Sequence, residues 1–411
     1  MALSQMIAAR LWAGAAGLGI CLGSSMMPEA QAGQSIRVLL ASDVEQLAIA
    51  SDQPLWVTDD QNQAWSYQSG LHIKVRGHAL ILNGKPVVTD RLTLRAGNHD
   101  LTMWLNGGGA RSAVQPSDEH GALRVSGVVQ LVRRGKRRLL INRVDLEEYV
   151  KGVVPAEVNS AWHPEMLKVQ AVATRTYALY QRMLNSTRAY DVAAGIQDQV
   201  YRGRQGIDAR VTAAVESTKG MVVTYQGVPI YAAFFSTAAG VTEDAMTVWS
   251  KDLPYLKGVE CPFDIESPYY QWSASVKIET LEKNLRQQGF SVGKISDIAP
   301  QSYSRAGRVA TLRVMHSNGE LVIRGEDLRK AVGYTIVPST QFTVLSIGQD
   351  LVLSGYGAGH AVGLCQWGAK ELAELGYSFS SILSYYYPGT ELRDAALTQT
   401  PPAPLASSPP S

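Results

Sequence analysis

Residues Asp145 to Leu184 read DLEEYVKGVVPAEVNSAWHPEMLKVQAVATRTYALYQRML. Asp145 suits a helix N-cap, and Glu148 stands three positions later, in the register of a capping box. We therefore expect a short helix that ends at Gly152, where a left-handed cap costs little. A second helix is expected from Pro164 to Leu184, because proline suits a first turn and apolar residues recur at helical spacing.

Glu157 lies between the two expected helices, in the stretch VVPAEVNSAW. Pro155 is expected to prevent the first helix from continuing. The apolar neighbours of the carboxylate are Val153, Val154, Val158 and Trp162. Partial desolvation would raise the pKa of Glu157 toward the range that a general acid needs. The alternative is structural, with Glu157 capping the following turn or forming an ion pair with Arg175.

The segments LEEYVKGVVPAEV and WHPEMLKVQAVATRTYA resemble the core motif of the SpoIID/LytB family, which contains the sporulation stage II protein D and amidase-enhancer proteins. The resemblance extends, with weaker stretches, from about Leu131 to Leu392. It implies an α+β fold, a SpoIID-like core with helices around an active-site cleft, and the activity of a peptidoglycan lytic transglycosylase. In that reading Glu157 is the catalytic glutamate, and Arg175 is the helix arginine that faces the same cleft.

Two further segments carry the resemblance and supply candidate substrate contacts. In DQVYRG, Gln199 would bond sugar hydroxyls and Tyr201 would stack on a ring, with core packing of Tyr201 as the alternative. The stretch from 355 to 392, GYGAGHAVGLCQWGAKELAELGYSFSSILSYYYPGTEL, is similar to a glycine-rich family signature and predicts helices over 366–375 and after Ser378. It implies that His360, Gln366 and Trp367 lie close to the cleft, with a structural role for His360 as the alternative.

The stretch YAAFFSTAAG, residues 231–240, resembles a family segment that usually has His before Ser-Thr and that binds zinc in some members. Phe235 takes the place of that His here, so no metal site is expected by this route, although Cys261, His360 and Cys365 together could assemble another. Ser236 is predicted to bind substrate. The alternative is that it is an ordinary serine at the end of a strand, with no role in binding. No cofactor is expected.

The first 32 residues have the pattern of a signal peptide, with Arg10 before an apolar run and Ala30-Gln31-Ala32 as a cleavage site. We therefore expect export to the periplasm or the cell wall, with an uncleaved anchor as the alternative. Cleavage would leave Cys261 and Cys365, and the sequence does not decide between a disulfide and two buried thiols.

The chain has 411 residues, 45% of them hydrophobic and 18% charged, with a formal charge of +2. This balance provides no strong field for nucleic acid, so no nucleic-acid partner is expected. Strand-like runs at 35–40 and 71–75 predict a β-rich region over 33–130. The expected catalytic domain covers 131–392, with a β-rich insertion at about 262–343, and a Pro/Ser-rich, disordered tail covers 393–411.

The resemblance to the SpoIID/LytB family, together with the signal-peptide pattern, implies an exported enzyme that cleaves glycan strands between MurNAc and GlcNAc and leaves 1,6-anhydroMurNAc ends. A single carboxylate suffices because the nucleophile, the muramyl 6-hydroxyl, belongs to the substrate. One alternative is a non-catalytic amidase enhancer that binds wall glycan or activates an N-acetylmuramoyl-L-alanine amidase. Another is plain hydrolysis with Glu243 or Asp198 as a second acid. Whether the glycan must first be denuded of its stem peptides stays open.

Overall fold

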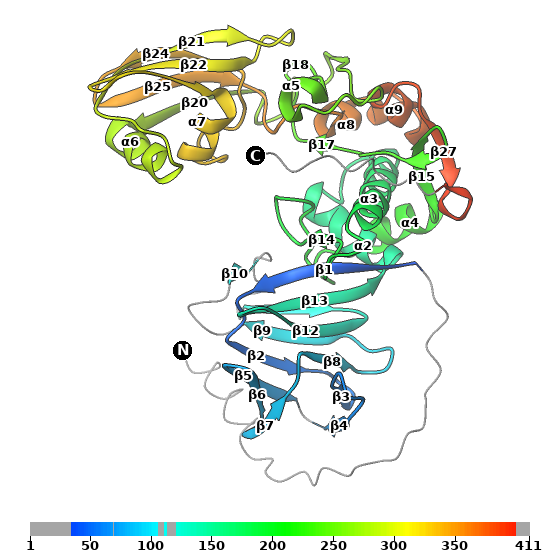
Figure 1. The fold of residues 1–411 in the computed structure, drawn as a ribbon. Coiled ribbons are helices and arrows are strands. Elements are labelled where there is room, and N and C mark those ends of the chain that lie inside the picture. The colour runs from blue at the N-terminus through cyan, green and yellow to red at the C-terminus, as the bar shows by residue number, and fades with distance from the viewer. Residues whose placement is uncertain (1–33, 69, 106–110, 113–120, 400–411) are drawn as a thin grey trace, which may run out of the picture. The chain divides into compact units, whose positions relative to one another are not determined.

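A computed structural model of the chain describes residues 34–68, 70–105, 111–112 and 121–399 (Figure 1). The predicted signal peptide, residues 1–32, and the end of the predicted tail, residues 400–411, lie outside the described residues. Helical segments and separate, mostly antiparallel sheets both build the protein, so the predicted α+β class is confirmed. The chain divides into two compact units: unit 1 has residues 1–161 and 177–220, and unit 2 has residues 162–176 and 221–411.

The larger sheet of unit 1 has the strand order β10-β1-β13-β12-β8-β3-β4, with β14 added beside β1. Its strands are β1 (Ser35–Ser42), β3 (Leu55–Thr58), β4 (Ala64–Tyr67), β8 (Arg91–Arg95), β10 (Arg111–Ser112), β12 (Val128–Arg134), β13 (Arg137–Asp145) and β14 (Val192–Ala193). Burial alternates along β1, where Ile36, Val38 and Leu40 are fully buried, so this sheet covers a core with one face.

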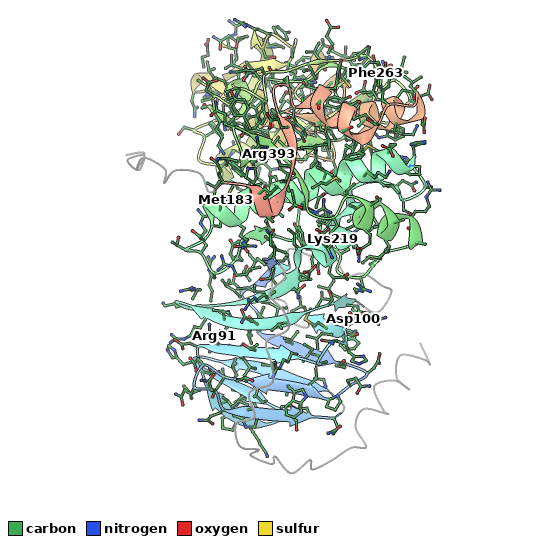
Figure 2. The ribbon with its side chains drawn as sticks, turned by 90° about the vertical axis from the view of Figure 1, so that its right-hand side faces the viewer. Arg91, Asp100, Met183, Lys219, Phe263 and Arg393 are labelled. Carbon is green, nitrogen blue, oxygen red and sulfur yellow. The ribbon has the colours of Figure 1, made fainter. Side chains whose placement is uncertain are left out.

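The second sheet of unit 1 has the order β11-β9-β2-β5-β6-β7. Its strands are β2 (Gln46–Ala50), β5 (Leu71–Arg76), β6 (Ala79–Leu82), β7 (Lys85–Val88), β9 (Leu101–Leu105) and β11 (Ala122–Val125). Both predicted strand runs are confirmed, within β1 and β5. Asp100, labelled in Figure 2, lies just before β9 and forms ion pairs with Arg124 at 3.0 Å and Arg204 at 3.5 Å. This pairing links the sheet to the segment that precedes the last helix of unit 1.

The helices α2 (Leu146–Glu157), α3 (Pro164–Leu184) and α4 (Ala209–Ser217) follow the sheets. The Asp145 carboxylate caps α2 as predicted, since it accepts the backbone N–H groups of Glu147 at 2.9 Å and Glu148 at 3.4 Å. Both bounds of α3 are also as predicted. The division between the two units falls inside α3, after Thr176.

The expected end of α2 at Gly152 is wrong, because the helix continues through Gly152 and Pro155 to Glu157. Gly152 serves close packing and not a left-handed cap. A Cβ atom there would lie 2.5 Å from the Gly203 carbonyl oxygen and 2.6 Å from a Tyr201 ring carbon. Pro155 is tolerated because it stands in the last turn, where its missing N–H removes a single helical bond before the helix ends.

Apart from the first part of α3 and residues 271–356, the described part of unit 2 has three small sheets and three α-helices. The strands are β15 (Met221–Tyr225), β16 (Val228–Pro229) and β27 (Glu391–Asp394), β17 (Phe234–Phe235) with β26 (Leu364–Cys365), and β18 (Gly240–Val241) with β19 (Glu260–Cys261). The helices are α5 (Ala245–Trp249), α8 (Gln366–Glu374) and α9 (Phe379–Tyr386), with a final 3₁₀ turn, η1 (Ala395–Leu397). The predicted helices over 366–375 and after Ser378 are confirmed as α8 and α9.

Residues 271–356 of unit 2 form a β-rich module with its own core. Its elements are β20 (Gln271–Lys277), α6 (Ile278–Gln287), β21 (Ile295–Tyr303), β22 (Val309–His316), β23 (Gly319–Arg324), α7 (Gly325–Val332), β24 (Phe342–Ile347) and β25 (Asp350–Tyr356). Leu281 of α6, Leu328 of α7 and Leu353 of β25 are completely buried in this shared core. None of the helices in the described ranges combines the length and the apolar character that a membrane crossing requires.

Candidate functional site

The residues predicted for the site divide between the two units. Unit 1 contains Glu157, Gln199 and Tyr201, and unit 2 contains Arg175, Ser236, His360, Gln366 and Trp367.

Glu157 is the last residue of α2 and is half-buried. The helix presents it directly after Val153 and Val154, which are fully buried, and before Val158, which is 4% exposed. Its Oε1 atom accepts the backbone N–H of Val200 at 2.7 Å. The segment DQVYRG, which the sequence associated with substrate, therefore lies against the carboxylate at the end of α2.

Gln199 and Tyr201 belong to the interior of unit 1. The Gln199 Oε1 atom accepts the Tyr149 hydroxyl at 2.9 Å. The Tyr201 ring stacks on Tyr149 with centroids 5.2 Å apart, and its hydroxyl donates to Asn142 Oδ1 at 2.9 Å. Since Tyr201 is 1% exposed, its ring is a packing surface, and contact with a sugar would require it to be uncovered.

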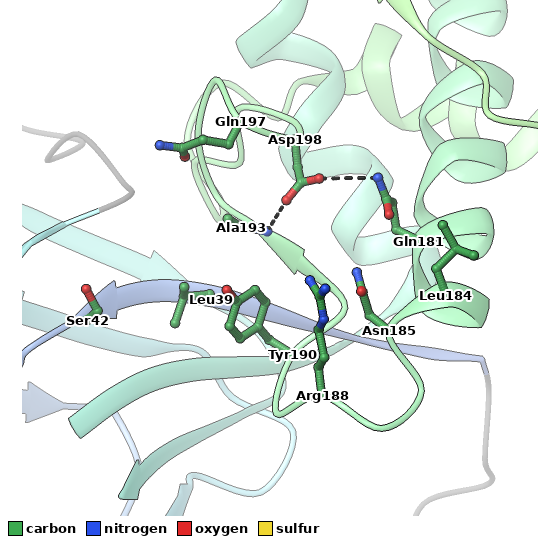
Figure 3. A pocket seen from close by; sticks show the side chains of 10 residues that line it. All are labelled: Leu39, Ser42, Gln181, Leu184, Asn185, Arg188, Tyr190, Ala193, Gln197 and Asp198. Atoms are coloured by element: carbon green, nitrogen blue, oxygen red, sulfur yellow. Dashed lines mark hydrogen bonds between the residues drawn. The ribbon is translucent and has the colours of Figure 1, made fainter. Parts of the chain in front are cut away.

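Asp198 lines a pocket of about 640 Å³ in unit 1, between β1, the end of α3 and the β14 segment (Figure 3). Its carboxylate accepts the Tyr177 hydroxyl at 2.7 Å and the backbone N–H of Ala193 at 2.8 Å. A third donor, the Gln181 amide, lies at 3.4 Å. These hydrogen bonds connect the loop that carries Asp198 to α3 and to β14. Glu157 is not among the residues that line the pocket.

Arg175 is the largest fully buried side chain of the described residues, with no exposed surface. Its Nη1 atom donates to the carbonyl oxygen of Met221 at 3.0 Å. The next residue, Thr176, accepts the backbone N–H of Val223 through Oγ1 at 3.0 Å. The guanidinium group is therefore part of the contact between α3 and β15 within unit 2.

Three predicted residues of unit 2 come together beside the first half of α3. The Gln366 amide donates to Gln170 Oε1 at 3.3 Å. The Trp367 ring packs edge-on against Trp162 with centroids 5.0 Å apart, and its backbone N–H donates to the Ser236 carbonyl at 3.1 Å. The structure thus joins the YAAFFSTAAG and LCQWGA segments through Ser236 and Trp367.

His360 lies in an aromatic group apart from that contact. Its ring centroid is 4.9 Å from Trp249 and 5.6 Å from Phe235. The Nδ1 atom accepts the backbone N–H of Val362 at 3.1 Å, which leaves the ring proton on Nε2. Burial lowers the pKa of His360 to about 4, and the positive charges of Arg329 and Arg308 act in the same direction. The imidazole is therefore neutral near pH 7.

Some polar residues around these positions were absent from the predicted set. Gln170 is completely buried on α3, and Asn142 is completely buried on β13. A polar residue within an apolar helical face was the available signal for Gln170. Asn142 had no local signal, because its role depends on Tyr201, which is far away in the sequence. Cys261 and Cys365, left open as a disulfide or two thiols, are both buried and free.

Comparison with known proteins identifies the class to which this chain belongs. A family model described as stage II sporulation protein matches residues 134–225, and a domain of unknown function matches residues 250–363. Stage II sporulation protein D of Bacillus subtilis is 34% identical over 275 residues, which cover 62% of this chain and 76% of that protein.

Two other relatives extend the comparison. An uncharacterized protein of Brachyspira hyodysenteriae is 30% identical over 272 residues, which cover 65% of this chain and 72% of that protein. The amidase enhancer of Bacillus subtilis is 33% identical over 289 residues, but the match covers 40% of that longer protein. The chain belongs to the SpoIID/LytB family, as the resemblance of its sequence motifs predicted.

Proposed function

We propose that this protein is an exported lytic transglycosylase that cleaves the glycan strands of peptidoglycan between MurNAc and GlcNAc. Membership in the SpoIID/LytB family supports a role related to the cell wall. The finer proposal depends on the chemistry available to Glu157.

In the proposed reaction, the Glu157 carboxyl group first donates its proton to the glycosidic oxygen as that bond breaks. The resulting carboxylate then takes the proton of the muramyl 6-hydroxyl, whose oxygen attacks the anomeric carbon. Water is not consumed, and the product carries a 1,6-anhydroMurNAc end. Because the nucleophile is tethered within the substrate, a second catalytic carboxylate is unnecessary.

The observation that carries this proposal is the setting of Glu157. The carboxyl group is half-buried at the end of a capped helix, it is flanked by buried valines, and the Val200 N–H fixes one oxygen at 2.7 Å. This gives a single acid a defined position with partial access to solvent, as proton transfer to a bound polymer requires. Arg175 is predicted to support the reaction, but these two proton transfers do not involve it.

The test is mass spectrometry of the products formed from peptidoglycan, both intact and stripped of stem peptides. We expect anhydromuramic ends with the natural protein and a loss of at least about 100-fold in rate with Glu157→Gln, the usual range for a general acid or base. Glu279→Gln, which changes an exposed glutamate of α6, is the matched control and should retain full activity. Reducing ends in place of anhydro ends would contradict the proposal and indicate hydrolysis.

The second candidate function is a non-catalytic amidase enhancer, which the name of one Bacillus subtilis relative suggests. This function predicts no glycan product from either substrate and predicts binding of wall glycan or of an N-acetylmuramoyl-L-alanine amidase. Stimulation of such an amidase that persists in Glu157→Gln, without anhydro products from the natural protein, would favour this candidate over the transglycosylase.

A further inference from the structure

Three buried side chains of unit 2 converge at the start of α8. Cys261 ends β19, Asp264 follows three residues later, and Cys365 ends β26 and caps α8. One ligand atom from each, two sulfurs and a carboxylate oxygen, lies within 4.8 Å of the other two. The pair Cys365 Sγ and Asp264 Oδ2 is 3.3 Å apart. His360, which the sequence suggested as a partner of the two cysteines, is not a member of this cluster.

The carboxylate of Asp264 is held from one side by the backbone. Its Oδ2 atom accepts the N–H groups of Ala238 at 2.6 Å and Ala239 at 2.9 Å. The residue is 1% exposed, and its Oδ1 atom has no hydrogen-bond partner among the described residues. A buried carboxylate oxygen without a partner is costly unless a positive group compensates it.

Two hydrogen-bonding groups lie beside the sulfurs. The Gly368 N–H donates to Cys365 Sγ at 3.4 Å, at the positive N-terminal end of α8. The Tyr386 hydroxyl lies at hydrogen-bond distance, 3.2 Å, from Cys261 Sγ. Such donors are the outer contacts that orient sulfur ligands and modulate metal affinity.

Gly368 keeps the space beside the sulfurs open. It stands in the first turn of α8, where glycine costs about 1 kcal/mol relative to alanine. A Cβ atom there would lie 2.5 Å from Cys261 Sγ and would also collide with the Tyr386 hydroxyl. Helix propensity therefore disfavours glycine at position 368, whereas the space beside the two sulfurs requires it.

We propose that Cys261, Asp264 and Cys365 bind a divalent cation, for which the ligand set favours zinc. Sulfur and carboxylate oxygen are both ordinary zinc ligands, at about 2.3 Å and about 2.1 Å, which places a tetrahedral sulfur–oxygen pair about 3.6 Å apart. The 3.3 Å between Cys365 Sγ and Asp264 Oδ2 is close to that value. Three protein ligands leave the fourth position to a water molecule.

Binding of a divalent ion by these ligands leaves the net charge unchanged when the release of protons is counted. The two thiols release two protons to solvent, and the two thiolates then neutralise the divalent ion, so the net charge of this interior does not change. None of the three ligands belongs to the stretch YAAFFSTAAG, through which no metal site was expected, although the Ala238 and Ala239 N–H groups of that stretch hold the Asp264 carboxylate. The ligands come from two segments that are distant in the sequence, 261–264 and the segment that contains Cys365, so the ion would fasten residues 355–392 to the segment that precedes the β-rich module.

The experiment measures metal in the full chain, purified without chelators, by inductively coupled plasma mass spectrometry before and after incubation with zinc. We expect about one equivalent of zinc in the natural protein and a loss of affinity of at least about 10-fold in Asp264→Asn and Cys365→Ser. Asp252→Asn, which changes an exposed aspartate, is the matched control and should bind as the natural protein does.

Because a cysteine variant can fail to fold, a second measurement uses the natural protein alone. Cobalt added in place of zinc should produce a thiolate-to-metal charge-transfer band, and acid release of the metal should leave both thiols reactive. Less than about a tenth of an equivalent of metal would overturn the proposal. A denatured mass lower by two hydrogens, which shows a disulfide, would overturn it equally, as would undiminished zinc binding in Asp264→Asn.

Discussion

His360 illustrates how the surroundings of one residue determine its chemistry. The Trp249 and Phe235 rings and the Val362 N–H hold the imidazole, while Arg329 and Arg308 make a positive charge there unfavourable. With a pKa of about 4, this side chain does not serve as a proton carrier near pH 7. The contacts fit the structural alternative, and a role in substrate binding stays a prediction.

The lowered pKa of His360 predicts a pH-dependent stability. Between pH 6.5, the ordinary value, and pH 4, the unfolded chain binds a proton that the folded chain does not. The stabilisation is complete above pH 6.5 and falls toward pH 4, by about 3 kcal/mol in total, since one pKa unit corresponds to about 1.4 kcal/mol. Urea denaturation across this range should show a shallower decline for His360→Asn, which retains an acceptor for Val362. Parallel curves for the two proteins would contradict the prediction.

Helix α2 shows how packing over a distance in sequence overrides local signals. Gly152 and Pro155 are both residues that end helices, yet the chain stays helical to Glu157. Gly152 is required because the Tyr201 ring and the Gly203 carbonyl approach its backbone directly.

Replacing Gly152 with alanine should therefore destabilise the protein, although alanine favours helices by about 1 kcal/mol. Overpacking against Tyr201 and Gly203 costs about 1–3 kcal/mol, and we expect it to prevail. Urea denaturation of the full chain measures the difference. Gly348→Ala is the matched control, since no atom lies within 4 Å of its added Cβ, and it should change stability by less than about 0.5 kcal/mol. A stabilised Gly152→Ala would contradict the packing argument.

Elements with strong local signals were predictable from the sequence. The bounds of α3, the Asp145 cap and the helices α8 and α9 follow from caps, prolines and apolar spacing. The surroundings of Glu157 were predictable only in part, because its valine neighbours are local but its Val200 contact is not. The link between Asp264 and the two cysteines could not be predicted, since a single carboxylate in a loop carries no periodic pattern.

At the scale of the whole molecule, the α+β class was implied by the resemblance of the sequence motifs to the SpoIID/LytB family. The division into two discontinuous units was not, because it depends on which distant segments contact one another. The β-rich module within unit 2 has a core built from its own elements, among them α6, α7 and β25.

A cavity in that core should affect the module first. Leu281→Ala removes a completely buried side chain and should cost about 2–5 kcal/mol, while Leu345→Ala, at 62% exposed, should cost less than about 0.5 kcal/mol. Amide hydrogen exchange of the full chain should rise in β20 to β25 for Leu281→Ala. An equal rise in β1 and β13 of unit 1 would contradict a separate core.

The helix α3 belongs to both units, since residues up to Thr176 are counted with one and residues from Tyr177 with the other. No single cut in the backbone can therefore release either unit whole. During synthesis from the N-terminus, unit 1 is complete only when Gly220 has been made, and the first half of α3 must then wait for the rest of unit 2. A chaperone or a protease that meets the growing chain would find Gln170 before its hydrogen-bond partner Gln366 has been made.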